Sequence, residues 1–281
     1  MLGMPGIESR SVVQSARSLF VLSLAVGMLV GCGSVGNLAT NTTTNTTTNT
    51  TLPLADSWQF SLVPASSAVP LVGDGIGAVL HMTTSEIVGT AHIMGVVLYG
   101  NADPCYNLMQ NIPLSGTIDA GGNISVASAP VAGQVLTFTG ILASDGASIS
   151  SGDYTFKGGC ADGQRGLLTG LKFKPVSGTY SGMLTSSITS FGVSADLTQS
   201  SGATGFFGVD GTVTYASPTC SKEFTITASQ LAGRFIQLFL TAKDGMRIIV
   251  SGSVDSQATQ IHLEDYDGVC GGGGEAVLNR E

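Results

Sequence analysis

Residues 118–146 read IDAGGNISVASAPVAGQVLTFTGILASDG. Within them, Val135–Leu142 alternates apolar with small polar residues, which is the period-two pattern of a β-strand. The pairs Gly122-Asn123 and Asp145-Gly146 interrupt the apolar pattern. Such pairs are typical of hairpin turns, because Gly and Asn tolerate the positive φ that a tight turn requires. This stretch therefore predicts antiparallel strands joined by short turns.

The same pattern recurs along most of the chain. No stretch of the body has a sustained helical apolar period with caps at both ends. We therefore expect an all-β body, an antiparallel meander that forms a β-barrel or a β-sandwich. Further strand-like runs are Trp58–Val63, Ile87–Tyr99, Gly211–Tyr215, Phe224–Thr227, Phe235–Thr241 and Ile248–Val254.

Two halves of the body resemble each other, which predicts an internal duplication of residues 54–177 and 178–281. A series of landmarks occurs in the same order in both: Gly-Thr, Cys, Ala-Gly before a strand, an Asp-Gly turn, Asp-Tyr and Cys. Whether the halves form two domains or two sides of one barrel stays open at this point. In the first half the landmarks begin at Gly89, Cys105, Ala132, Asp145, Asp153 and Cys160, and in the second at Gly211, Cys220, Ala232, Asp244, Asp265 and Cys270.

The N-terminus carries an uncharged apolar run at residues 19–30, preceded by Arg10 and Arg17. A helix of this run would be about 18 Å long, which is too short for a hydrocarbon core of about 30 Å. The segment therefore has the character of a signal peptide rather than a permanent membrane helix.

The run ends in Leu29-Val30-Gly31-Cys32, which resembles the lipobox of bacterial lipoproteins. The resemblance implies that residues 1–31 are a signal peptide, that Cys32 is lipidated, and that its new amino group is acylated, for example with palmitate. Several acyl chains anchor a protein firmly, whereas a single chain binds a membrane only marginally. Gly33, where Asp would imply retention in the inner membrane, points to the cell outer membrane of a Gram-negative host.

After the lipobox, residues 32–53 include the repeat NTTTNTTTNTT at 41–51. No residue of this repeat contributes to an apolar core, so the entropy cost of ordering it would not be repaid. We expect residues 32–53 to be a disordered tether between the lipidated Cys32 and the β-body.

The body is similar to the Gly/Ser/Thr-rich exported β-proteins of Gram-negative soil bacteria. Trp58-Gln59-Phe60, shortly after the tether, and the cysteines next to glycine carry this resemblance. It implies no particular activity.

Four cysteines remain in the body: Cys105, Cys160, Cys220 and Cys270. An oxidising compartment makes disulfides the expected state of an exported chain, and four cysteines allow three pairings. The duplication selects Cys105–Cys160 and Cys220–Cys270, each worth about 4 kcal/mol in the chain-entropy model. A Cys/His metal site is disfavoured, because no CxxC pair is present.

The sequence predicts no catalytic residue, no cofactor and no firm metal site. Eleven basic and nineteen acidic residues give a net charge of −8, which argues against a nucleic-acid partner. His81, Glu86 and His92 are weak metal-ligand candidates, because the two histidines are eleven positions apart and fall on opposite faces of a continuous strand. The chain lacks G-x-S-x-G, and the acidic segment 264–268 is interpreted as a turn.

These features predict a lipid-anchored protein of the cell envelope that is a non-catalytic binding or structural module. Its partners would be the membrane, through the N-terminal lipid, and an extracellular small molecule, glycan or protein. One alternative is a metal- or carboxylate-dependent hydrolase of envelope or extracellular polymers. Another is a barrel that carries a lipid in the manner of lipocalins.

Overall fold

The computed structural model describes residues 56–65, 75–94, 111–131, 133–185, 190–201, 205–217, 220–265 and 274–281. In these ranges the chain forms antiparallel β-strands and one short 3-10 helix, η1 (Gly159–Ala161). The predicted signal peptide, Cys32 and the tether lie outside the described residues.

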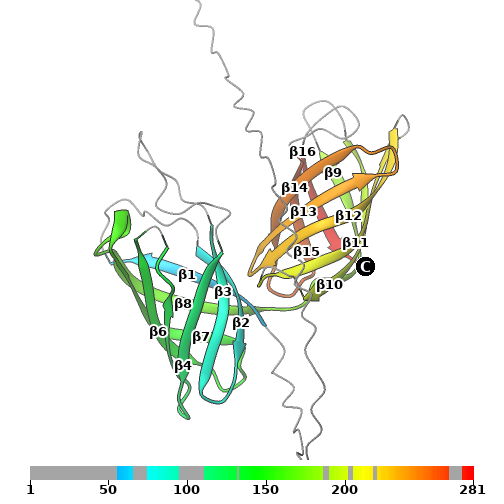
Figure 1. Cartoon of the computed structure of the whole chain (residues 1–281). Helices are drawn as coiled ribbons and strands as arrows, with labels where there is room; N and C mark the ends of the chain where they lie inside the picture. The colour runs from blue at the N-terminus through cyan, green and yellow to red at the C-terminus, as the bar shows by residue number, and fades with distance from the viewer. Residues whose placement is uncertain are drawn as a thin grey trace, which may run out of the picture. The chain divides into compact units, whose positions relative to one another are not determined.

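The first eight strands form a closed barrel in which each strand pairs with the next along the chain (Figure 1). Its strands are β1 (Asp56–Pro64), β2 (Gly75–Met82), β3 (Glu86–Met94), β4 (Ile112–Ile118), β5 (Asn123–Ser128), β6 (Val135–Leu142), β7 (Ser148–Lys157) and β8 (Arg165–Phe173).

The next eight strands form a second closed barrel with the same meander (Figure 1). Its strands are β9 (Ser177–Thr185), β10 (Ser190–Ser201), β11 (Phe207–Ser217), β12 (Cys220–Ala232), β13 (Phe235–Ala242), β14 (Arg247–Val254), β15 (Gln260–Asp265) and β16 (Gly274–Arg280).

Each barrel closes by pairing its first strand with its last. In the first barrel Leu62 of β1 lies opposite Leu168 of β8, and in the second Leu184 of β9 lies opposite Ala276 of β16. Closure leaves neither sheet with an unpaired edge. The prediction of an all-β antiparallel meander is confirmed. Of its two alternatives, the structure has barrels and not a sandwich.

Each barrel is filled by the inward side chains of its own strands. The alternation along β13 and β6 shows why, since every second residue is buried and the residues between them are more exposed. The first core includes Trp58, Phe60 and Phe138. The second core also includes Phe173, the last residue of β8, and Val176 of the segment that joins the barrels, so this segment packs into the second barrel.

The turn between β4 and β5 shows how local sequence sets these hairpins. The Asp119 carboxylate accepts hydrogen bonds from the backbone N–H groups of Gly121, at 2.8 Å, and Asn123, at 2.9 Å. Gly122 has a φ of 80°, a conformation that is strained for residues with a Cβ atom. Asn123 donates a further bond to the Asp119 carboxylate, which lowers the pKa of that group.

The internal duplication is confirmed by the two barrels, but one expected correspondence within it is wrong. The Ala-Gly and Asp-Gly landmarks flank β6, the sixth strand of the first barrel, and β13, the fifth strand of the second. Gly89-Thr90 and Gly211-Thr212, in contrast, both fall on the third strand of their barrel. The mismatch arises because Ala-Gly and Asp-Gly are turn residues that any hairpin accepts.

The turn between β12 and β13 contacts the first barrel. Its Gly233 N–H donates to the Ser57 hydroxyl at 2.8 Å, and its Arg234 N–H donates to the Gln59 side-chain oxygen at 3.0 Å. Both acceptors are buried residues of β1. A small apolar cluster, of Val79, Phe206 and Ala232, lies beside these bonds.

Candidate ligand-binding groove

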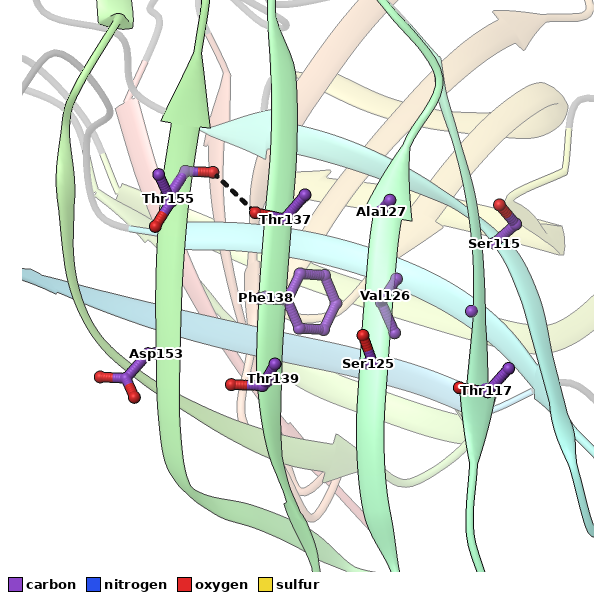
Figure 2. Close-up of a pocket in the computed structure, with 11 residues that line it drawn as sticks. Ser115, Thr117, Ser125, Val126, Ala127, Thr137, Phe138, Thr139, Asp153 and Thr155 are labelled. Atoms are coloured by element: carbon purple, nitrogen blue, oxygen red, sulfur yellow. Dashed lines mark hydrogen bonds between the residues drawn. The ribbon is translucent and has the colours of Figure 1, made fainter.

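A groove of about 390 Å³ lies on the outer face of the first barrel, across β4, β5, β6 and β7. Its volume falls in the range of small-molecule sites, which is about 300–1,000 Å³. Figure 2 shows its lining side chains on these four neighbouring strands. Six of the eleven lining residues carry a hydroxyl group, and the lining consists of Ser115, Gly116, Thr117, Ser125, Val126, Ala127, Thr137, Phe138, Thr139, Asp153 and Thr155.

The register of the strands arranges the outward residues in two rows. In one row Ser115 of β4 lies opposite Ala127 of β5, and Thr137 of β6 lies opposite Thr155 of β7. Because successive side chains point to opposite faces, Val126 and Phe138 turn inward, and each is only 2% exposed.

The second row runs one step further along the strands. Thr117 lies opposite Ser125, and Ser125 lies opposite Thr139 on its other side. Asp153 follows on β7, next to Tyr154, which pairs with Phe138. Neighbouring strands are about 4.8 Å apart and residues two apart on one strand are about 6.7 Å apart, so the hydroxyls form a grid.

Most polar groups of the groove are free to bind a ligand. Thr137 donates a hydrogen bond to the Thr155 carbonyl at 3.4 Å, the contact drawn in Figure 2. In the part of the chain that the structure describes, no hydrogen bond or ion pair engages the side chains of the second row, Thr117, Ser125, Thr139 and Asp153. A hydroxyl both donates and accepts, so this row offers donors and acceptors together.

The corresponding strands of the second barrel, β12 to β15, present a different outer face. There the Thr227 hydroxyl donates to the Phe239 carbonyl at 3.1 Å and lies 3.3 Å from the Thr241 hydroxyl. Gln237 donates to the Ser251 hydroxyl at 3.2 Å. These polar groups bond to one another, whereas the second row of the groove does not.

The structure does not bring together the predicted metal-ligand candidates. In the β2–β3 hairpin His81 lies opposite Val88 and His92 lies opposite Gly77, so the histidines are four residue pairs apart. Glu86 lies on β3, opposite Thr117 of β4. Among the described residues, no group of three or more His, Cys, Asp or Glu is placed to hold a metal ion.

His92 instead packs as an aromatic side chain. It is 3% exposed, stacks on Phe235 with ring centroids 4.8 Å apart, and meets the edge of Phe206 at 5.9 Å. Its Nδ1 is buried without a hydrogen-bond partner. Burial lowers the pKa of His92, because the charged imidazolium loses its hydration.

The predicted disulfide and lipidation residues fall largely beyond the described chain. Cys32, Cys105 and Cys270 lie outside the described residues, as does the 266–268 part of the acidic segment. Cys160 lies in η1, between β7 and β8, and Cys220 is the first residue of β12. The pairing of the four body cysteines therefore stays a prediction.

The groove itself was not among the sequence-based candidates. Its signal was present as alternating small polar residues at Ser115-x-Thr117, Thr137-x-Thr139 and Asp153-x-Thr155. Such alternation also describes any solvated strand face, so it gains meaning only when the register places these strands side by side.

Within the described ranges, no helix has the length and apolar character needed to cross a membrane. Comparisons of the chain with protein-family models, with curated proteins and with solved structures found no match.

Proposed function

We propose that this protein is a lipid-anchored protein of the cell envelope whose first barrel binds a glycan without altering it chemically. The observation that carries the proposal is the row of unengaged side chains at Thr117, Ser125, Thr139 and Asp153. Glycans expose many hydroxyl groups, and each can exchange its hydrogen bonds to water for bonds to such a row.

The charge of the groove supports a neutral or cationic glycan rather than an acidic one. Asp153 is the one charged residue of the lining, which holds no Lys, Arg or His. A phosphate or carboxylate ligand would find no cation to pair with and would be repelled by Asp153. The net charge of −8 acts in the same direction.

The single carboxylate of the lining supports binding rather than hydrolysis. Glycosidases of the usual kinds place two carboxyl groups on either side of the scissile bond, at about 5–5.5 Å or 6.5–9.5 Å. Asp153 has no second carboxylate beside it in the groove lining. A general acid and its partner are therefore not offered together at this surface.

The anchor is part of the proposal and rests on the lipobox at residues 29–32 and on the Asn/Thr-rich segment that follows it. We expect Cys32→Ser to release the protein from the membrane fraction and to abolish incorporation of labelled palmitate. A variant that stays membrane-bound and labelled would contradict the anchor and leave the groove proposal standing.

The binding proposal is tested by calorimetry of the full-length protein with neutral hexasaccharides, such as cellohexaose and chitohexaose. The double variant Ser125→Ala/Thr139→Val removes two hydroxyls of the second row, and we expect it to weaken binding at least tenfold. Thr169→Val is the matched control, because Thr169 is exposed on β8 of the same barrel but outside the lining. Equal binding by the double variant and the control would contradict the groove as the site.

A further inference from the structure

We propose that Asp153 makes the groove prefer a glycan with free amino groups, such as an oligomer of glucosamine, over an uncharged or N-acetylated one. This inference rests on the proposed function, because it specifies the ligand of the same groove. It starts from the contrast between Asp153 and the other aspartates of the first barrel.

The other aspartates that the structure describes in this barrel are already engaged by the protein. Asp56 pairs with Lys172 at 2.8 Å, Asp119 and Asp145 accept backbone N–H groups of their own turns, and Asp162 accepts the Gly158 N–H at 2.7 Å. Asp153 is exposed on β7, and no side chain or backbone group of the described chain bonds to its carboxylate. Figure 2 shows Asp153 at the β7 edge of the groove, level with Thr139, with its carboxylate directed away from Thr139.

A free carboxylate at the edge of a row of hydroxyls selects for a cationic donor. Hydroxyls bond equally well to neutral groups of any sugar, so they give little preference between glycans. A carboxylate accepts from an ammonium group in a charge-assisted bond that is roughly twice as strong as a neutral one. N-acetylation removes this charge and replaces the ammonium with a neutral amide.

The surface next to Asp153 suits the apolar face of a sugar ring. Leu167 of β8 lies opposite Asp153, and Val63 of β1 lies opposite Leu167 on its other side. These two side chains are 61% and 59% exposed, so an apolar surface lies next to the Asp153 end of the second row. A pyranose ring has polar edges and C–H faces, and this surface offers a partner to each.

The test is calorimetry of the full-length protein with glucosamine hexamer, N-acetylglucosamine hexamer and cellohexaose at 50 mM salt. We expect the glucosamine hexamer to bind at least tenfold more tightly than the other two. In Asp153→Asn this preference should be lost, so that the three oligomers bind with equal affinity. Because exposed charges are screened, 500 mM salt should also reduce the preference.

Asp196→Asn is the matched control, since Asp196 is an exposed aspartate on β10 of the second barrel. We expect this variant to keep the full preference. Equal affinity for all three oligomers in the unaltered protein, or an unchanged preference in Asp153→Asn, would overturn the inference and leave glycan binding intact. Binding of none of the oligomers would overturn the proposed function as well.

Discussion

At the scale of single residues, glycines allow the strands of the second barrel to approach closely. Gly211 of β11 has a φ of 134°, and a Cβ atom added there would clash with the Asp196 carbonyl oxygen of β10. Gly192 lies on the same strand pair without a positive φ, and the nearest atom to its Cβ would be 3.7 Å away.

Gly211→Ala should therefore lower the free energy of unfolding by about 1–3 kcal/mol, through backbone strain and the steric clash. Gly192→Ala should leave it unchanged or raise it slightly, because Ala restricts the unfolded chain. Urea denaturation followed by circular dichroism measures both. A larger loss for Gly192→Ala than for Gly211→Ala would contradict this account.

His92 should make stability depend on pH. Its pKa is lowered in the folded state, so below its ordinary value of 6.5 the unfolded chain binds the proton more readily than the folded one. The contribution of neutral His92 to the free energy of unfolding is therefore complete above about pH 6.5. It is lost as the pH falls from there toward the pKa of His92 in the folded state.

We expect the urea concentration at the unfolding midpoint to decrease when the pH is lowered from 7.5 to 5.5. The decrease should be smaller in His92→Phe, which keeps an aromatic ring against Phe235. His262→Gln is the control and should keep the full decrease, because the His262 side chain is 40% exposed and lies at the surface beside Glu275. The same decrease in His92→Phe as in the unaltered protein would assign the effect to other groups.

At the scale of elements, the positions of the cysteines in the strand order support the predicted disulfides. Cys105 and Cys220 fall in sequence where the third and fourth strands of each barrel meet, and Cys160 and Cys270 fall between the seventh and eighth. In a meander, alternate connections lie at the same rim of the barrel. Gln134, between β5 and β6, accordingly accepts the Ala161 N–H between β7 and β8, at 3.0 Å.

Non-reducing peptide mapping of protein purified from membranes should therefore find Cys105 linked to Cys160 and Cys220 linked to Cys270. Both linkages should disappear after reduction. A linkage that joins the two barrels would contradict the pairing, and free thiols would contradict the oxidising compartment on which it rests.

At the scale of the whole molecule, each barrel has its own closed sheet and its own core. Residues 172–281 include Phe173 and Val176, which pack into the second core. We expect this segment to fold alone, with dispersed amide signals in NMR spectra and cooperative thermal unfolding.

The isolated segment loses the two hydrogen bonds that join the β12–β13 turn to β1, together worth about 2 kcal/mol. Its melting temperature should then lie about 10 °C below that of the full-length chain. An unfolded segment 172–281 would show that the second barrel depends on the first.

The sequence was sufficient for features that depend on neighbouring residues. Alternation along Val135–Leu142 predicted β6, and Asp145-Gly146 and Asp244-Gly245 predicted turns at which the glycines adopt φ of 67° and 86°. These predictions succeed because side-chain alternation and turn conformation are set within a few residues.

Closure of the barrels and formation of the groove depend on contacts between residues that are far apart in the sequence, which local patterns do not encode. The pairing of β1 with β8 joins residues about a hundred positions apart, and it distinguishes a barrel from a sandwich. The groove needs the registers of four strands before Thr117, Ser125 and Thr139 become neighbours. A shift of one residue would turn these hydroxyls into the core, so their common face is a property of the assembled sheet.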